Sequence, residues 1–418
     1  MDTGKTLTQL NNLIRHCQNT PFYRDRLPLV PLQSLEDFRC IPLMTQEDLR
    51  NNSPFGMICV PETQLFQYHE SFGTTGTPFS VWLTQEDYET NAAELSDWGV
   101  CFHSRDIVMV RFPYSISAIA HTITTTAQLR GSCVIPAGAR SKVSPFPRVV
   151  NMLQKLKVTV LACLPLQVLL IAETAELMGF DPKKDFPDLR AICTAGETLA
   201  PGRRKTLESI WSVPVFDNYG MTEFGVAVVD CQYQQPHPQE DYFYFEILRE
   251  DLTTIAEPGE TGYLVITTLK RRGTPLVRYL TGDLARLIPG NCACGAIFSL
   301  EVRGWAQEII KLKNRHLDLW EVEELVARLP CRRFWVAAPN HGTLDIIVEE
   351  EQAGETVTPE LLKSLERAFD ITLSVTVVPR GTLYDRQELL SIGVVGKPQY
   401  IYTAQEMLER KYLKSVRV

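Results

Sequence analysis

The sequence lacks the features that direct a protein into or across a membrane. It has no uninterrupted apolar run long enough to span a bilayer. The first ten residues carry one lysine and no apolar core, so we expect no signal peptide. Eleven cysteines without an export signal therefore predict reduced thiols in a cytoplasmic protein, where clustered cysteines are better interpreted as metal ligands.

An excess of positive charge is also absent. The 418 residues carry 42 lysines and arginines against 50 aspartates and glutamates, which gives a net charge of −8. General binders of nucleic acids and of anionic membranes carry basic patches, so we expect neither kind of partner. The residues that are present, 44% hydrophobic and 22% charged, are typical of a globular protein, and the length predicts two or three domains.

The order of predicted elements indicates an α/β fold. A layered part alternates helices with strands at a spacing typical of parallel sheets, with helices at 148–157 and 164–177 and strands at 158–162, 189–194 and 214–216. The pattern then changes to antiparallel strands, at 242–247, 262–267 and 276–279. A smaller α+β segment follows Gly304. We therefore predict a large N-terminal domain of layered α/β and β-rich subdomains over 1–303, and a small C-terminal domain over 304–418.

The stretch Ser71–Pro78 is the first candidate for a binding site. Six of its eight residues are glycine or carry a hydroxyl group, and predicted strands flank it at 65–68 and 81–83. Glycine lets a backbone approach a ligand closely, and successive amide groups with serine and threonine hydroxyls can hold a phosphate. The alternative is an ordinary hairpin loop. The stretch is not a Walker A loop, because no Gly-Lys-Ser/Thr follows.

Three further stretches combine small residues with one acid. Thr194–Glu197, Asp217–Glu223 and Tyr279–Asp283 each stand at the end of a predicted strand. Because ligands bind at the carboxyl ends of strands in open α/β sheets, these stretches together predict a nucleotide site. Each one alone is equally typical of a turn or of a solvated helix start.

A second constellation contains Cys231, His237, Cys292 and Cys294. Three thiols and one imidazole can form a closed tetrahedral zinc site. The spacing is not that of a standard zinc finger, and the alternative is a set of unrelated thiols.

Taken in order, these motifs resemble the adenylate-forming superfamily of acyl-CoA synthetases, luciferases and peptide-synthetase adenylation domains. Within it, the chain is most similar to the phenylacetate-CoA ligase branch. The resemblance covers nearly the whole chain, well in the N-terminal two-thirds and loosely in the C-terminal third. The stretches that carry it are Thr20–Arg24, Ile41–Thr45, Ser71–Thr77, Tyr219–Glu223 and Tyr279–Asp283.

The resemblance implies a role for each matching residue in binding ATP. The phosphates would lie against Ser71, Gly73, Thr74, Thr75, Gly76 and Thr77. The adenine and acid pocket would be lined by Ala195, Gly196 and Glu197, with Asn218 and Tyr219 against the purine and Gly220 bordering both nucleotide and acid. The remaining contacts would be Thr222 to the α-phosphate, Glu223 to Mg²⁺ and Asp283 to the ribose hydroxyls.

The reaction that the resemblance implies has two steps. A carboxylate attacks the α-phosphorus of ATP and pyrophosphate leaves, so that catalysis consists mainly of positioning and charge neutralisation. The acyl-adenylate then passes its acyl group to a thiol, either that of coenzyme A or that of a carrier protein. The branch also often carries a Cys/His zinc site in the region of Cys231–Cys294, which favours a structural Zn²⁺ here.

The chain departs from the family pattern at the junction before the small domain. Where the family has Gly-Arg-x-Asp, Trp305 replaces the arginine that contacts ribose and Gln307 replaces the hinge acid. Arg303 is the candidate substitute for that arginine. Lys397 is the candidate for the lysine that neutralises the α-phosphate, and a solvated loop lysine is the alternative reading of it.

The substrate pocket would use the segment from Phe112 to His121. Its small and apolar character, with Tyr114 nearby, suits an aryl acid, and His121 can hydrogen-bond a ring substituent or be a satisfied core histidine. The alternative function is a degenerate adenylate-binding or one-step adenylating protein that forms no thioester. We expect a homodimer.

Overall fold

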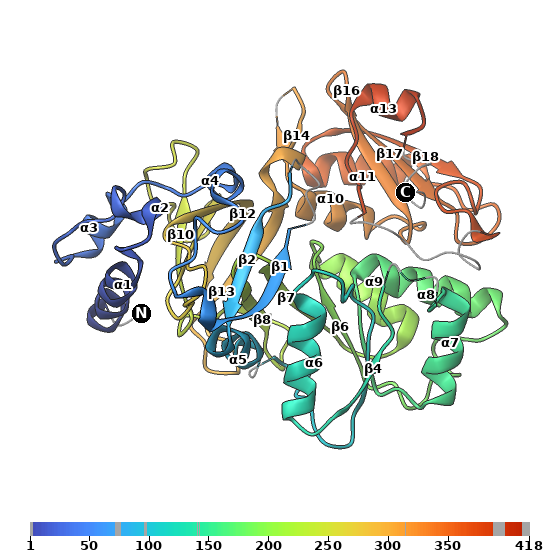
Figure 1. Ribbon diagram of the computed structural model, residues 1–418. Helices are drawn as coiled ribbons and strands as arrows, with labels where there is room; N and C mark the ends of the chain where they lie inside the picture. The colour runs from blue at the N-terminus through green and yellow to red at the C-terminus, as the bar shows by residue number, and fades with distance from the viewer. Residues whose placement is uncertain are drawn as a thin grey trace. The chain divides into compact units, whose positions relative to one another are not determined.

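The computed structural model describes residues 3–71, 77–95, 98–139, 141, 143–313, 315–387 and 398–411. The chain divides into two compact units (Figure 1). Unit 1 consists of Met1–Arg105, Pro113–Cys133 and Phe216–Val302. Unit 2 consists of Asp106–Phe112, Val134–Val215 and Arg303–Val418. The predicted domain boundary between residues 303 and 304 stays a prediction.

Unit 1 holds the first helices of the chain and most of its antiparallel strands. Its helices are α1 (Thr3–Cys17), α2 (Pro21–Arg24), α3 (Leu35–Arg39), α4 (Gln46–Asn52), η1 (Glu62–Gln64), α5 (Gln85–Glu94) and α6 (Ile119–Leu129). Its strands are β1 (Leu65–Glu70), β2 (Ser80–Thr84), β7 (Val215–Met221), β8 (Gly225–Asp230), β9 (Pro236–Pro238), β10 (Phe243–Leu248), β11 (Thr261–Thr268), β12 (Tyr279–Pro289) and β13 (Phe298–Trp305). A strand that extends across the division belongs to the unit that holds most of its residues.

The core of unit 1 is built on a four-stranded antiparallel sheet of order β10-β11-β12-β13. Leu10, Leu13 and Ile14 recur at helical spacing on α1, and all three are buried. They form one hydrophobic cluster with Phe243 and Ile266 of the sheet. The antiparallel strands predicted at 242–247 and 262–267 are confirmed.

The next strand differs from its predicted range. The sequence predicts a strand at 276–279 followed by a turn, but β12 begins at Tyr279. Arg278 has a φ of +49°, which interrupts the extended backbone directly before it. Gly282 has a φ of +86° and lies where the register of the β11–β12 pairing shifts, so it belongs to a bulge and not to a turn. Asp283 therefore lies within a strand.

Strand β7 is longer than the predicted strand at 214–216. It continues to Met221 because β8, whose six residues are all buried, pairs with it in antiparallel orientation. The sequence analysis did not predict β8. Asn218, Tyr219 and Gly220 consequently lie within a hairpin strand, and the turn of the hairpin contains Thr222.

Unit 2 contains the parallel strands. Its strands are β3 (Ile107–Val110), β4 (Cys133–Pro136), β5 (Val160–Ala162), β6 (Ala191–Ala195), β14 (Ile310–Lys311), β15 (His316–Leu317), β16 (Trp335–Asn340), β17 (Thr343–Glu349) and β18 (Thr372–Val378). Its helices are α7 (Phe146–Lys155), α8 (Pro165–Leu177), α9 (Pro201–Trp211), η2 (Ala306–Glu308), α10 (Leu319–Val326), α11 (Pro359–Phe369) and α13 (Ala404–Leu408).

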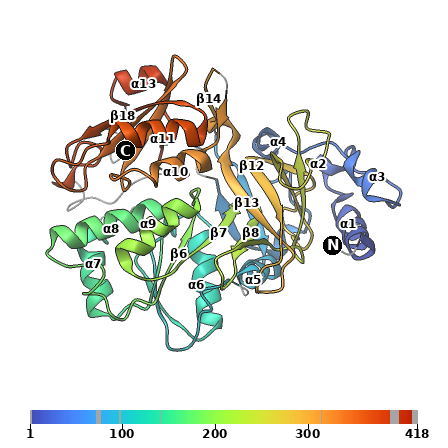
Figure 2. The ribbon, with the colours of Figure 1, turned by 180° about the vertical axis from the view of Figure 1, so that it is seen from behind.

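The first part of unit 2 confirms the predicted α/β layering. Strands β3 and β5 pair in parallel, and so do β5 and β6. Buried Leu161 and Ile192 of these strands share a hydrophobic cluster with Val149, Leu169 and Leu207 of α7, α8 and α9. Figure 2 shows these three helices in green. Thr194 and Ala195 end β6, as the sequence predicts.

The C-terminal part of unit 2 confirms the predicted α+β pattern. Its sheet has the order β16-β17-β18, in which β17 pairs antiparallel with β16 and parallel with β18. Val322 of α10 and Leu365 of α11 are buried in one cluster with Ile346 of β17. Within the described ranges, no helix combines the length and the apolar character that crossing a membrane requires.

Candidate active site and metal centre

Two hydrogen bonds join the β7–β8 hairpin to β12 in unit 1. The Tyr219 hydroxyl donates to Asp283 Oδ2 over 2.6 Å. The Tyr279 hydroxyl donates to Glu223 Oε1 over 3.1 Å. Tyr279 is fully buried and Glu223 is 4% exposed. Two carboxyl groups that are far apart in the sequence are thereby brought to one place, as the sequence analysis predicts.

Both tyrosines are neutral hydrogen-bond donors. Burial and then the charge of Asp283 raise the pKa of Tyr219 well above its usual value. Burial and then the charge of Glu223 raise the pKa of Tyr279 in the same way. A neutral phenol orients the carboxylate that accepts its hydrogen bond. An oriented carboxylate suits a hard cation or a sugar hydroxyl group.

The hairpin leaves little room around Gly220. A Cβ atom on Gly220 would lie 2.2 Å from the carbonyl oxygen of Gly225, so a larger residue would displace the opposite strand. Asn218 is 3% exposed in the same strand, and Thr222 lies in the turn beside Glu223. The structure thus brings the predicted nucleotide residues of this hairpin and of β12 together within unit 1.

The Ser71–Pro78 stretch is described at its two ends. Ser71 and Phe79 close the base of the loop, since Ser71 N–H donates to Phe79 O and Phe79 N–H donates to Ser71 Oγ, each over 3.1 Å. Arg50 Nε donates to Thr77 O over 3.1 Å. Gly73, Thr74, Thr75 and Gly76 lie outside the described residues, and their phosphate contacts stay a prediction.

The end of β1 adjoins the predicted substrate segment. Glu70 N–H donates to Ile116 O over 3.1 Å, and His69 Nδ1 lies 3.0 Å from the same oxygen. His121 Nε2 lies 2.9 Å from Tyr114 O, and the Tyr114 hydroxyl lies 2.8 Å from a threonine hydroxyl of α6. Tyr114 and His121 therefore support each other within unit 1, and their contact with an acid stays a prediction.

Glu197 belongs to a buried cluster in unit 2. Arg203 Nη2 donates to Glu197 Oε2 over 2.9 Å, and the Tyr400 hydroxyl donates to the same oxygen over 2.6 Å. Arg203 Nη1 donates to Glu323 Oε1 over 2.7 Å. Ala195 and Gly196, with a φ of +80°, directly precede Glu197. The sequence analysis did not predict this cluster, because its members are spread over the chain from 197 to 400.

Removing the shared cation of this cluster should destabilise the protein strongly. Arg203→Met leaves two buried carboxyl groups without their partner, and we expect a loss of about 3–5 kcal/mol in the free energy of unfolding, measured with denaturant. Burial raises the pKa of Glu323 to about 7, which is above its unfolded value. Protonation of Glu323 therefore favours the folded state at low pH, so the loss should be smaller at pH 5 than at pH 8.

Arg286→Met is the matched control for that experiment. Arg286 pairs with Glu301 over 2.7 Å, with side chains 32% and 21% exposed. Partly exposed pairs contribute about 0–1 kcal/mol, so this variant should unfold nearly as the unsubstituted protein does. Equal losses of unfolding free energy in the two variants would mean that the buried cluster stabilises the protein no more than a partly exposed pair does.

Arg303 forms an ion pair within unit 2. Its Nε donates to Asp318 Oδ2 over 2.5 Å and its Nη2 donates to Asp318 Oδ1 over 3.1 Å. Asp318 caps α10 at the same time, so the guanidinium stabilises the start of that helix. The ribose contact of Arg303 stays a prediction, and Lys397 lies outside the described residues.

A hollow of about 530 Å³ opens in the C-terminal part of unit 2. Its lining includes Lys313, Lys363 and Arg367 together with Glu366 and Asp370. Of the predicted nucleotide and acid residues that the structure describes, none lines it.

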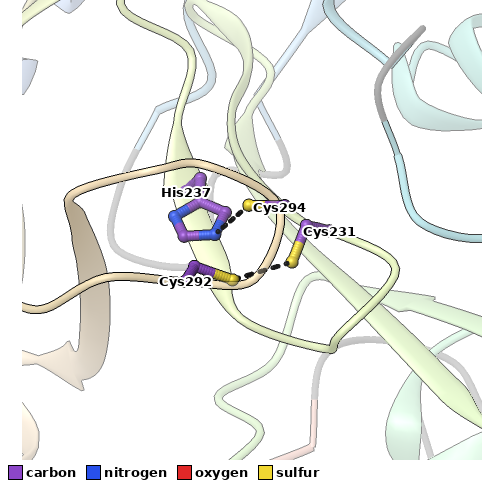
Figure 3. A group of neighbouring side chains, drawn as sticks. All are labelled: Cys231, His237, Cys292 and Cys294. Carbon is purple, nitrogen blue, oxygen red and sulfur yellow. Dashed lines mark hydrogen bonds between the residues drawn. The ribbon is translucent and has the colours of Figure 1, made fainter.

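The four predicted zinc ligands gather at one point in unit 1 (Figure 3). Their ligand atoms all lie within 4.8 Å of one another. Cys231 Sγ lies 3.6 Å from Cys292 Sγ, and Cys294 Sγ lies 3.3 Å from His237 Nε2. Ligand atoms on a tetrahedral zinc ion stand about 3.5–3.8 Å apart, so the two distances are close to those around the ion, and all four atoms lie within about 1 Å of that spacing. The distance between the two sulfurs does not fit a disulfide, whose sulfurs are about 2.05 Å apart.

The surroundings of the cluster also fit a metal centre. His237 Nδ1 lies 2.8 Å from Phe298 O, a contact that directs Nε2 toward the cysteines (Figure 3). Tyr233 N–H donates to Cys231 Sγ over 3.4 Å. The N–H of Cys294 and the neighbouring side chains lower the pKa of Cys292 to about 6, which favours the thiolate form that a metal binds.

Comparisons with known proteins agree with this geometry. The family model for the AMP-binding enzyme matches residues 71–267. The chain is 27% identical to the phenylacetate-coenzyme A ligase of Pseudomonas putida over 90% of each chain. It is 29% identical to the phenylacetate-coenzyme A ligase of Aromatoleum evansii, over 78% of this chain and 75% of that one.

The fold has a solved counterpart. The crystal structure of 2-hydroxyisobutyryl-CoA ligase in the postadenylation state, in complex with 2-HIB-AMP, matches with a TM-score of 0.86 at 19% identity. The match covers 99% of this chain and 92% of that chain. The fold of the chain is therefore that of this ligase, and Glu223 and Asp283 lie in it as acids that accept hydrogen bonds from tyrosine hydroxyl groups. Residues 71–267 thus resemble the AMP-binding enzyme family, and the chain is similar over most of its length to phenylacetate-CoA ligases.

Proposed function

We propose that the protein uses ATP to convert a carboxylic acid into an acyl-adenylate, and then transfers the acyl group to the thiol of coenzyme A. The observation that supports this most is the meeting of Glu223 and Asp283, each held by a tyrosine hydroxyl group, in a chain similar over most of its length to phenylacetate-CoA ligases. We include in this proposal the predicted small C-terminal lid domain over 304–418.

Different residues of unit 1 would bind different parts of the nucleotide. Asp283, oriented by the Tyr219 hydroxyl, would accept hydrogen bonds from the ribose, and the ring of Tyr219 would lie against the purine. Glu223, oriented by Tyr279, would hold Mg²⁺ together with phosphate oxygens. The ion would neutralise charge that develops on the phosphates. Thr222, beside Glu223, would contact the α-phosphate.

The chemistry balances without a further reactant. A carboxylate oxygen of the acid forms a bond to the α-phosphorus, the bond from that phosphorus to the bridging oxygen of pyrophosphate breaks, and pyrophosphate leaves. The sulfur of the thiol then attacks the acyl carbon, AMP leaves, and the thiol proton passes to solvent. Lys397 would act in the first of these steps.

An aryl acid is the substrate class that we propose. The paired rings of Tyr114 and His121, whose centroids are 5.4 Å apart, would form an aromatic wall of its pocket. A carrier-protein thiol is the alternative acceptor. The cytoplasm as the location and a homodimer as the assembly remain part of the proposal.

We also propose a structural Zn²⁺ at Cys231, His237, Cys292 and Cys294. A site with four protein ligands has no open position for a substrate, so its contribution would be to stability and not to the reaction. The proposal draws on the spacing of the four ligand atoms and on the hydrogen bonds around them.

One observation favours a second candidate function, adenylation without thioester formation. Trp305 and Gln307 occupy the places of the family arginine and hinge acid, and Arg303, the candidate substitute, is bound in two places by Asp318. Binding ATP and forming the adenylate would not need the hinge, whereas completing the second step would.

One assay series separates the two functions. The protein is incubated with ATP, Mg²⁺, labelled pyrophosphate and each of a panel of aryl acids, and acid-dependent exchange of label into ATP is measured. Thioester formation is then measured after adding coenzyme A or a carrier protein. Exchange followed by coenzyme A thioester supports the first function, and exchange without any thioester supports the second. Absence of exchange with every acid would refute both catalytic forms.

A further inference from the structure

The turn that bears Thr222 and Glu223 is held from two sides. On one side, the Tyr279 hydroxyl donates to the Glu223 carboxylate. On the other side lies a cluster of three buried polar residues that the proposed mechanism does not use, two of which bond to the backbone on or beside the turn. They are Asn91 and Glu94 of α5, which are 3% and 2% exposed, and Arg271, which follows β11 and is 5% exposed.

Two contacts of this cluster end on or beside the turn, and a third joins two of its side chains. Val226 N–H donates to Glu94 Oε2 over 2.8 Å. Arg271 Nη2 donates to Phe224 O over 2.5 Å and to Asn91 Oδ1 over 2.9 Å. Phe224 directly follows Glu223, and the backbone groups of Phe224 and Val226 on the two sides of Gly225 are therefore bonded to side chains from other elements.

Gly225 shows how closely the cluster packs. Its φ is +95°, and a Cβ atom there would lie 2.5 Å from Glu94 Oε2 and 2.9 Å from Asn91 Oδ1. The same atom would lie 3.0 Å from Arg271 Nη2. A side chain at position 225 would therefore displace these three groups, so the turn packs against the cluster with no room for a larger residue.

Helix α5 relates this turn to the hairpin of the predicted phosphate loop. It follows β2 directly, and Asp87 in its first turn accepts hydrogen bonds from Thr84, Arg272 and Gly273 N–H groups over 2.9, 2.6 and 2.8 Å. Strand β2 pairs with β1, whose last residue precedes Ser71. One short helix thus joins the base of the Ser71–Pro78 stretch, the segment of Arg271 and the turn of Glu223.

We infer that Glu94, Asn91 and Arg271 are positioning residues, which fix the turn of Glu223 relative to the phosphate-loop hairpin and so set where the divalent cation meets the ATP phosphates. This inference rests on the proposed function. Burying a carboxyl group and a guanidinium costs desolvation energy that apolar side chains would avoid. In return, these polar groups form directed hydrogen bonds to Phe224 O and Val226 N–H, which apolar side chains could not form.

The charge state of Glu94 helps in designing the test. Burial raises the pKa of Glu94 to about 8, although Arg271, the Val226 N–H group and Lys270 lower it and Asp87 raises it. At pH 7 the neutral form is therefore the major one, and Glu94→Gln copies its shape and keeps an oxygen acceptor for Val226 N–H. Glu94→Leu has a similar size but has no acceptor.

The experiment measures the binding of Mn²⁺, as a paramagnetic substitute for Mg²⁺, with α,β-methylene-ATP, in which the bond that the reaction breaks is blocked. At pH 7 we expect Glu94→Leu and Arg271→Lys to weaken Mn²⁺ binding in this complex about 10–100-fold, the usual effect of losing a group that orients a metal ligand. Glu94→Gln should stay within about twofold of the unsubstituted protein, because the directed bond survives.

Asp106→Asn is the control for loss of stability. Asp106 is 1% exposed and pairs with Arg190 over 2.6 Å before β3 of unit 2. This variant should lower the unfolding temperature while Mn²⁺ binding stays unchanged. Unchanged binding in folded Glu94→Leu and Arg271→Lys, or equal weakening in Asp106→Asn, would overturn the inference. Failure of the unsubstituted protein to bind the metal–nucleotide complex would instead refute the proposed function.

Discussion

Glu223→Ala is expected to lower acid-dependent ATP–pyrophosphate exchange by about 10²–10³-fold, the loss that follows removal of one preorganised electrostatic contact in an active site. Glu223 is almost fully buried and is oriented by the Tyr279 hydroxyl, so solvent cannot easily replace its carboxylate. Under the proposed function, removal of this negative charge deprives the divalent cation of a protein ligand. Raising the Mg²⁺ concentration should therefore restore part of the exchange rate.

Two further variants make this prediction specific. Glu223→Gln keeps an acceptor for the Tyr279 hydroxyl but removes the charge, and its rate should resemble that of Glu223→Ala. Glu260→Ala removes a carboxylate that pairs with Arg249 over 2.8 Å at the surface of the same unit, and it should leave exchange unchanged. If Glu223→Gln exchanges label at the rate of the unsubstituted protein, then Glu223 maintains the conformation of the turn and does not hold the cation.

Cys292→Ser is expected to abolish stoichiometric zinc binding and to lower the midpoint of thermal unfolding by about 10 °C, which corresponds to several kcal/mol in a unit of this size. Structural zinc contributes about 10–16 kcal/mol in small zinc peptides that have no other core. A smaller loss is expected here, because unit 1 has a hydrophobic core of its own. Metal analysis of the purified protein and a thermal melt measure the two effects.

Cys133→Ser is the matched control, since Cys133 is an exposed cysteine outside the cluster. It should retain one zinc per chain and the original unfolding midpoint. A chelator should reproduce the effect of Cys292→Ser in the unsubstituted protein and have little further effect in the variant. Purified protein without zinc, or Cys292→Ser with a full equivalent of it, would remove the metal assignment.

The elements with a clear local pattern could be predicted from the sequence. Helices α7 and α8 and strands β5 and β6 lie within a few residues of their predicted ranges, because apolar periodicity and β-branched runs are local properties. The predicted boundaries of the strands that became β7 and β12 were wrong, because contacts with other strands set where these two begin and end. A buried partner strand, β8, extends β7, and Gly282 forms a bulge where its sequence is typical of a turn.

The candidate site shows the same difference between residues with a local sequence pattern and contacts between distant segments. Residue type and order singled out Glu223, Asp283 and the four proposed zinc ligands as candidates, and the structure brings the members of each set together. The sequence analysis assigned no role to Tyr279 as the partner of Glu223, and it missed the pairing of Glu197 with Arg203 and Tyr400. Partners that are distant along the chain leave no local pattern by which they can be recognised.

By itself, the sequence determined which chemical groups this protein possesses and which short segments carry them, since side-chain chemistry and local backbone preference belong to individual residues. Only the tertiary structure decided which of these groups meet. Tyr219 reaches Asp283, and Glu94 reaches the turn of Glu223, because packed strands and helices bring together residues that the chain itself keeps apart.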